Sequence, residues 1–184
     1  MNFVQTALPG VVIVEPKVFR DPRGFFAETY QKEKFAAGGI DAVFVQDNHA
    51  ASSRGVLRGL HVQLRRTQAK LVRAVEGAVY DVAVDVRRGS PTFGRWAAAE
   101  LSAENFRQLY IPQGFAHGYC VLSERAQVEY KTTDFYDPES EIVVLYNDPA
   151  IGIAWPIADP VLSKRDAGGK PLAAWIDRLP PYRP

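Results

Sequence analysis

Short runs of β-branched and aromatic residues, broken by Gly, Pro, Asp and Ser, recur along almost the whole chain. Runs of this length and composition are typical of strands. The strands expected from them cover residues 11–14, 24–30, 42–46, 56–63, 70–75, 78–86, 95–101, 107–111, 117–122, 126–132 and 142–145. Helix is expected only over residues 31–37, ended by Gly38 and Gly39, and over residues 171–179.

The high density of strands favours an all-β fold, either a barrel or a two-sheet jelly roll. A length of 184 residues is enough for one domain with a substantial core. Repeats, low-complexity tracts and linkers are not evident in the sequence. We therefore expect a single domain over residues 1–184.

Alternation within the strands shows where polar side chains would lie. Asp81 and Asp85 fall on one face of the run 79–85, and Val82 and Val84 fall on the other. Isolated polar groups among small or apolar ones are what the lumen of a ligand-holding barrel would carry. An ordinary sheet with one wet face would show the same pattern, and periodicity alone does not separate the two.

Composition and charge narrow the classes of function. The chain is 47% hydrophobic and 23% charged, and its net charge of +1 gives no sign of binding to nucleic acid or to an acidic membrane. The single cysteine, Cys120, excludes an internal disulfide and a Cys-rich zinc site, and its apolar neighbours predict a buried, inert thiol. With no recognisable signal peptide or membrane-spanning segment, we expect a cytoplasmic protein.

The most informative candidate for chemistry is His61, an imidazole in an apolar strand-like run, with Lys70 nine positions later. A base beside a cation suits a site that removes a proton next to a carbonyl and holds the resulting enolate. Gly55 and Gly59 bracket the run and permit close approach of another backbone or a ligand. The structural alternatives are a core histidine bonded to a backbone carbonyl and a solvated lysine at the end of a strand.

Three further residues fit the same chemistry. His117, between glycines, is a candidate for assisting Lys70 or contacting phosphate, and Tyr130 for returning a proton from the face opposite His61. Asp166 is a candidate for orienting His61 and stabilising its charged form. Each residue has a structural alternative. His117 could be a packed histidine, Tyr130 a core tyrosine, and Asp166 part of a surface charge run.

A metal centre is the other chemistry that the histidines allow. His49, His61 and His117 could act as ligands inside a barrel. The sequence has no His-x-His pair, and Val62 and Gln63 follow His61. These features disfavour metal catalysis.

Taken together, the motifs resemble the nucleotide-sugar epimerases of deoxysugar pathways, the dTDP-4-dehydrorhamnose 3,5-epimerase family. The resemblance covers nearly the whole chain. It is carried by residues 21–28, 46–48, 56–61, 70–73, 80–85, 111–118 and 147–149, and by Leu162, Ser163 and Asp166.

This resemblance implies a cupin-type jelly roll, a homodimer, and catalysis without a metal or redox cofactor. It implies that His61 accepts a proton, that Asp166 orients it, that Tyr130 donates a proton and that Lys70 stabilises the enolate. The residues implied to bind the nucleotide sugar are Arg23, Phe26, Glu28, Gln46, Asn48, Arg58, His117, Tyr136, Glu141 and Arg165. Residues 23–28 would reach the site of the partner subunit.

The expected reaction inverts C3 and C5 of dTDP-4-dehydro-6-deoxy-glucose and gives dTDP-4-dehydro-L-rhamnose. An alternative is a mono-epimerase acting at C3 or C5 only on a related dTDP-4-keto-deoxysugar. Two other classes also stay open, a metal-dependent cupin oxygenase and a non-catalytic module that binds sugar nucleotides.

Overall fold

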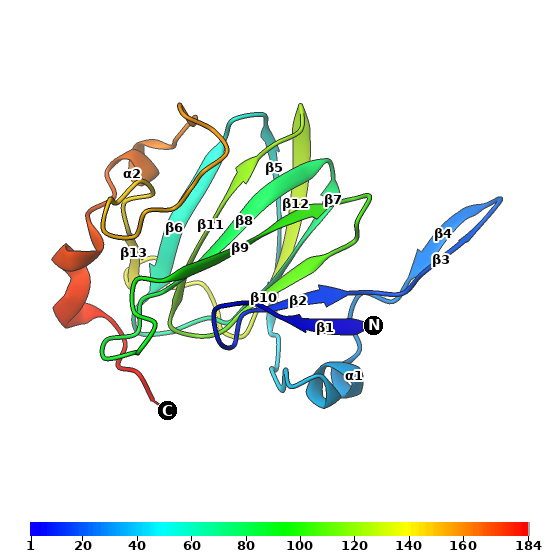
Figure 1. Cartoon of the computed structure of the whole chain (residues 1–184), viewed down its shortest axis with the longest axis horizontal. Helices are drawn as coiled ribbons and strands as arrows, with labels where there is room; N and C mark the ends of the chain where they lie inside the picture. The colour runs from blue at the N-terminus through cyan, green and yellow to red at the C-terminus, as the bar shows by residue number, and fades with distance from the viewer. Residues whose placement is uncertain (184) are drawn as a thin grey trace.

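The polypeptide forms two facing antiparallel β-sheets with a few short helices outside them (Figure 1). The computed structural model describes residues 1–183. One sheet has the strand order β1-β2-β10-β7-β12-β5, and the other has the order β13-β6-β11-β8-β9. The predicted all-β fold of jelly-roll type is confirmed.

The strands and helices have the following bounds. The strands are β1 (Asn2–Gln5), β2 (Val12–Glu15), β3 (Val18–Asp21), β4 (Gly24–Ala27), β5 (Gln46–Ser53), β6 (Leu57–Gln63), β7 (Lys70–Glu76), β8 (Ala78–Asp85), β9 (Trp96–Ser102), β10 (Gln108–Ile111), β11 (Phe115–Val121), β12 (Arg125–Thr132) and β13 (Glu141–Val143). The helices are α1 (Lys32–Ala37), α2 (Lys164–Ala167) and a 3-10 helix, η1 (Leu172–Arg178).

The main core lies between the two sheets. Val72 of β7 and Val128 of β12 pack there against Val79 of β8 and Val121 of β11, and all four are almost completely buried. Alternating residues of each strand supply this layer, as in other sandwiches. The prediction for β8 is confirmed, because Asp81 and Ala83 face this interior while Val82 and Val84 face the other side of the sheet.

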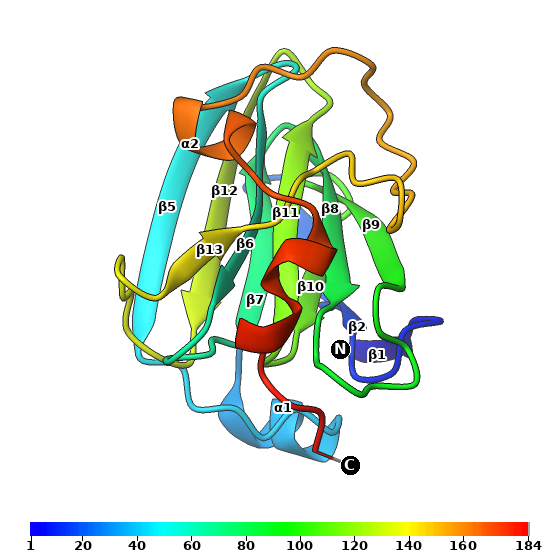
Figure 2. The same cartoon turned by 90° about the vertical axis from the view of Figure 1, so that its left-hand side faces the viewer.

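A second core covers the outer face of the five-stranded sheet. The C-terminal part of the chain lies across this face, as Figure 2 shows for α2 and η1. Leu172 and Leu179 are buried there in one cluster with Leu60 and Val82. The backbone N–H of Leu172 donates to Asp148 Oδ2 at 2.7 Å, which anchors the segment. This packing holds α2, and with it Asp166, beside β6.

The sequence prediction missed β1 and β3 and misplaced the edge strand β5. A strand was expected over residues 42–46, but it covers Gln46–Ser53, a run of polar and small residues with low strand propensity. Its ladder with β12 extends from Thr132↔Gln46 to Arg125↔Ser53. Pairing with a well-packed neighbour therefore outweighs local propensity in this segment.

Strands β3 and β4 form a hairpin that projects away from the two sheets (Figure 1). The sequence predicted one strand over residues 24–30, and the hairpin shortens it to residues 24–27. Phe25 and Phe26 on this hairpin are 60% and 68% exposed.

The predicted helices are largely confirmed. Helix α1 begins where Gln31 Oε1 accepts the backbone N–H of Lys34 at 2.6 Å, and Gly38 ends it. The expected helix at residues 171–179 is the 3-10 helix η1. Within residues 1–183, every helix falls short of the length and hydrophobicity that a bilayer span requires.

Candidate active site

His61 and Asp166, 105 positions apart in sequence, form a hydrogen-bonded pair beside strand β6 of the five-stranded sheet. Strand β6 carries His61 and helix α2 carries Asp166, and His61 Nε2 lies 2.6 Å from Asp166 Oδ1. Ser163, the N-cap of α2, donates its hydroxyl to Asp166 Oδ2 at 2.8 Å. Because Nε2 is bonded to the carboxylate, Nδ1 is the ring nitrogen that remains free to accept a proton.

The environment of Asp166 keeps it ionised. Burial acts to raise the pKa of this carboxyl group, but hydrogen bonds from His61 and Ser163, the charge of His61 and the backbone of Gly59 outweigh it and lower the pKa. A carboxylate in this position stabilises the imidazolium that forms when His61 takes up a proton.

Gly59 allows His61 to lie beside His117. Its φ is +128°, and a Cβ atom there would lie 2.6 Å from Gly118 Cα and 2.8 Å from the carbonyl oxygen of His117. Strands β6 and β11 therefore approach more closely than side chains at these positions would permit. His61 and His117 are direct cross-strand partners, so both imidazoles face the interior between the sheets.

His117 is buried and paired with Asp81 of β8. Its Nε2 lies 2.6 Å from Asp81 Oδ1. Burial lowers the pKa of His117, and the positive charges of Lys70 and His61 add to this effect, while Asp81 opposes it. His117 is therefore a neutral imidazole at neutral pH, which suits hydrogen bonding to a ligand better than proton abstraction.

Lys70, at the start of β7, reaches the same interior from the six-stranded sheet. Its Nζ lies 5.9 Å from the centroid of the Tyr130 ring. Burial lowers the pKa of Lys70, and the carboxylates of Glu141 and Asp81 partly restore it. An ammonium group in a partly desolvated space acts strongly on any oxygen anion that forms nearby.

Tyr130 points into the same interior from the six-stranded sheet. It lies on β12, and its ring packs against the core layer between the sheets. Burial raises the pKa of Tyr130, with smaller contributions from Glu141 and Tyr136, while Arg58 opposes the rise. The phenol therefore keeps its proton at neutral pH and can act as a donor.

A polar network closes one end of this space. Arg165 Nη1 donates to the Tyr136 hydroxyl at 3.2 Å, and that hydroxyl donates to Glu141 Oε2 at 3.3 Å. Arg165 also forms an ion pair with Glu141. The Tyr136 backbone N–H donates to Gln46 Oε1 at 3.1 Å, and Gln46 donates to Asn48 Oδ1 at 3.0 Å. The network joins β5, β13, α2 and the segment before β13.

Arg58 lies at the start of β6 and bridges to the edge strand β5. Its Nε donates to Ser52 Oγ at 3.1 Å, and its Nη2 donates to the carbonyl of Ala51 at 3.4 Å. The guanidinium stays exposed and acts electrostatically on Tyr119 and Tyr130. An exposed guanidinium at the rim of a polar interior is suited to a phosphate group.

Three of the predicted binding residues lie elsewhere in the single chain. Arg23 is on the projecting hairpin, where it pairs with Asp21 at 2.6 Å and has an 89% exposed side chain. Phe26 is on the same hairpin, and Glu28 follows it and pairs with Lys34 at 2.6 Å. The fold thus gathers eleven of the predicted residues in or around the interior, but leaves Arg23, Phe26 and Glu28 outside it.

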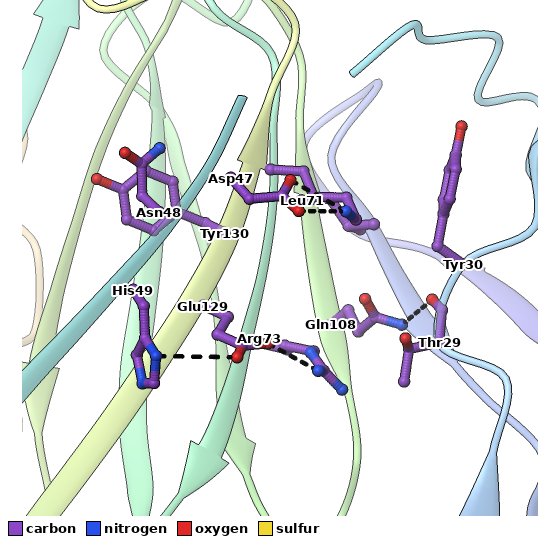
Figure 3. Close-up of a pocket in the computed structure, with 11 residues that line it drawn as sticks. Thr29, Tyr30, Asp47, Asn48, His49, Leu71, Arg73, Gln108, Glu129 and Tyr130 are labelled. Carbon is purple, nitrogen blue, oxygen red and sulfur yellow. Dashed lines mark hydrogen bonds and ion pairs between the residues drawn. The ribbon is translucent and has the colours of Figure 1, made fainter. Parts of the chain in front are cut away.

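A pocket of about 330 Å³ lies on the outer face of the six-stranded sheet, and Asn48 and Tyr130 are among the residues that line it (Figure 3). Two ion pairs line it, Lys131 with Asp47 at 2.9 Å and Arg73 with Glu129 at 2.7 Å, and His49 Nδ1 lies 4.0 Å from Glu129. His49 therefore does not converge with His61 and His117. Residues 1–183 contain no group of three or more His, Cys, Asp or Glu side chains placed to hold a metal ion.

Sequence reasoning missed some members of the site. Tyr119 and Ser52 received no role, although Tyr119 follows His117 by two positions and so shares its face of β11. That periodicity was a usable signal for Tyr119. Ser52 gave none, because the strand that carries it was placed wrongly.

A jelly roll that holds an imidazole–carboxylate pair, a phenol and an ammonium between its sheets defines a class of protein, the cupin-type enzymes with acid–base chemistry. Comparison with known proteins narrows this class. The family model described as dTDP-4-dehydrorhamnose 3,5-epimerase matches residues 5–174. The chain belongs to the dTDP-4-dehydrorhamnose 3,5-epimerase family.

Individual relatives agree with this assignment. The dTDP-4-dehydrorhamnose 3,5-epimerase of Pseudomonas aeruginosa is 57% identical over 175 residues, which cover 94% of this chain and 97% of that protein. The enzyme of the same name from Neisseria gonorrhoeae is 58% identical over 174 residues, and these span 94% of this chain but 53% of that protein.

Solved structures show the same likeness. A dTDP-6-deoxy-D-glucose-3,5-epimerase from Legionella pneumophila, in complex with dTDP-4-keto-L-rhamnose, superposes with a TM-score of 0.97 at 48% identity, over 100% of this chain and 99% of that one. The predicted family and the cupin-type fold are therefore confirmed.

Proposed function

We propose that the chain inverts C3 and C5 of dTDP-4-dehydro-6-deoxy-glucose and produces dTDP-4-dehydro-L-rhamnose. The observation that carries this proposal is that the His61–Asp166 pair and Tyr130 face one interior from opposite sheets. Family membership and the ligand of the Legionella structure support the choice of substrate.

In the proposed mechanism, the C4 ketone acidifies the protons on C3 and C5. His61 Nδ1 removes one of them, and the electron pair moves onto the C4 oxygen as an enolate. Lys70 stabilises that oxygen anion, since a base of ordinary strength cannot form an enolate unaided. The Tyr130 hydroxyl then donates a proton to the same carbon from the other face, and the stereocentre inverts.

The test of this proposal is proton NMR of the wild-type protein with the substrate in deuterated water. The proposal predicts that the signals of both the C3 and the C5 protons disappear while the L-sugar forms. Exchange at one carbon only would identify a mono-epimerase, the activity named for a 41% identical relative from Streptomyces niveus, a dTDP-4-dehydrorhamnose 3-epimerase. Binding without exchange at either carbon would indicate a sugar-nucleotide-binding module.

We further propose that the protein is a cytoplasmic homodimer in which each hairpin completes the partner's site. The exposed Phe25 and Phe26 and the free edge of β5 support this arrangement, as does the distance of the hairpin from the sheets of its own chain (Figure 1). Arg23 would add a guanidinium for the diphosphate. The buried Cys120, whose pKa burial raises to about 11, fits a reducing compartment.

Mixed dimers test the role of the hairpin. Arg23→Ala and His61→Asn are each expected to lose most activity, by about tenfold or more for Arg23→Ala because a charge-assisted contact is lost. When equal amounts of the two variants are refolded together, half of the dimers should be hybrids. In each hybrid, one site has both an intact His61 and an intact Arg23 from the partner, and the other site has neither. Activity should therefore return to about a quarter of the wild-type value. No gain on mixing would show that the hairpin acts within its own subunit.

A further inference from the structure

Two buried polar atoms have no hydrogen-bond partner within residues 1–183, Asp81 Oδ2 and Tyr119 Oη. Asp81 is fully buried, and Tyr119 is 4% exposed. The two residues are direct cross-strand partners on β8 and β11. Buried polar atoms without a partner are rare because they forfeit the hydrogen bonds that water would make. Two such atoms on neighbouring residues of adjacent strands therefore call for a common explanation.

Both atoms belong to side chains that face the interior containing the acid–base residues. The other oxygen of Asp81 is bonded to His117, and the Tyr119 ring lies 6.2 Å from the His117 ring. Tyr119 lies within electrostatic range of Arg58, Tyr130 and Asp81, and Lys70 lies within range of Asp81. The Ser52 side chain also approaches the Tyr119 hydroxyl, but the contact does not meet hydrogen-bond geometry and leaves that hydroxyl able to donate to a ligand. The mechanism proposed above uses neither of the unpartnered oxygens.

The chemistry of the pair defines the group that would satisfy it. Burial is the main cause that raises the pKa of Tyr119 to about 12, so its hydroxyl stays protonated and can donate. An aspartate oxygen accepts. A donor beside an acceptor is complementary to a group that can accept one hydrogen bond and donate another. In a sugar, that group is a hydroxyl.

We propose that Asp81 Oδ2 and Tyr119 Oη bind the C2 hydroxyl of the substrate sugar and thereby select 2-hydroxylated over 2-deoxy sugars. This inference rests on the proposed function. The substrate has no hydroxyl at C6, has a ketone at C4, and moves its C3 hydroxyl to the other face when C3 is inverted. Among the hydroxyl groups of the hexose, only the one at C2 keeps its configuration through both inversions, so it is the hexose hydroxyl that suits a fixed donor and acceptor.

The experiment compares two substrates, dTDP-4-dehydro-6-deoxy-glucose and its 2-deoxy analogue. Tyr119→Phe keeps the ring that packs in the core and removes only the hydroxyl. It should lower kcat/KM for the 2-hydroxylated substrate by about 3- to 15-fold, mainly through KM, as expected for one neutral hydrogen bond. It should change kcat/KM for the 2-deoxy analogue by less than about twofold, because that substrate makes no such bond.

Tyr80→Phe is the matched control. Tyr80 precedes Asp81 on β8 but packs on the outer face of the sheet against Trp155. This variant should act on both substrates as the wild type does. Equal losses of kcat/KM by Tyr119→Phe on both substrates, or no loss on either, would overturn this inference but leave the proposed function standing. If the wild-type protein turned over neither substrate, the proposed function would fail and this inference with it.

Discussion

Replacement of His61 by asparagine is expected to lower kcat about 10³- to 10⁴-fold and to stop deuterium exchange at both C3 and C5. The asparagine side chain is polar and of similar size, but it cannot accept a proton from carbon. Asp166, 2.6 Å from His61 Nε2, cannot take over, because Ser163 and the Gly59 backbone still hydrogen-bond to its carboxylate in the variant and keep it a weak base. Initial rates and proton NMR in deuterated water measure both effects.

His49→Asn provides the control for this variant. His49 lies on the outer face of the six-stranded sheet, beside Glu129 and away from the interior (Figure 3). It should keep wild-type rates and wild-type exchange. If His61→Asn still exchanged either proton at the wild-type rate, another group would be the base, and the assignment of His61 would be wrong.

Lys70→Met is expected to have the second largest effect, a loss of about 10²- to 10³-fold in kcat. Methionine fills a similar volume but leaves the enolate oxygen without a cation. The free energy of unfolding should stay equal or rise, because burial already lowers the pKa of Lys70 and so disfavours its charged form in the folded chain. Urea denaturation checks stability, and steady-state kinetics check the rate.

The pH dependence gives an independent test of Lys70. The pKa of Lys70 is lowered from the ordinary value of 10.5. As pH rises through this lower pKa, the ammonium loses its proton and no longer stabilises the enolate. We therefore expect kcat to fall at a pH below that at which a free lysine loses its proton. Lys70→Arg keeps the charge and should move this fall to higher pH. Lys32→Arg, on the exposed face of α1, should leave the profile unchanged. An unchanged profile in Lys70→Arg would contradict the role of Lys70.

Alternation and strand composition predicted much of the site. The faces of β8 were correct, because the side-chain period follows directly from strand geometry. Periodicity left open whether the polar face lines an interior or meets solvent, and the second sheet decides this for Asp81, which is buried between the sheets. Helix α1 was predictable because its cap and stop signals are local. These features depend on neighbours in sequence rather than on the packing of distant segments.

Other features depend on tertiary packing and were not predictable from spacing. The pairing of His61 with Asp166 depends on how the C-terminal segment covers the outer face of the five-stranded sheet. The short charged run at residues 164–166 gives no sign of that packing. Chemistry made Asp166 one candidate partner of His61 beside the alternative of a surface charge run, and the family resemblance favoured the pair. The position of β5 depends on its ladder with β12, and the role proposed for Arg23 on the hairpin would depend on a second chain.

The central claim is that His61 and Tyr130 act on opposite faces of one enolate, and Tyr130→Phe in deuterated water tests it most directly. The phenylalanine keeps the ring that packs between the sheets but has no proton to donate. The account predicts that exchange continues, because His61 still removes and returns protons on its own face, while inversion stops at one carbon at least. Formation of the doubly inverted sugar at the wild-type rate by Tyr130→Phe would contradict it.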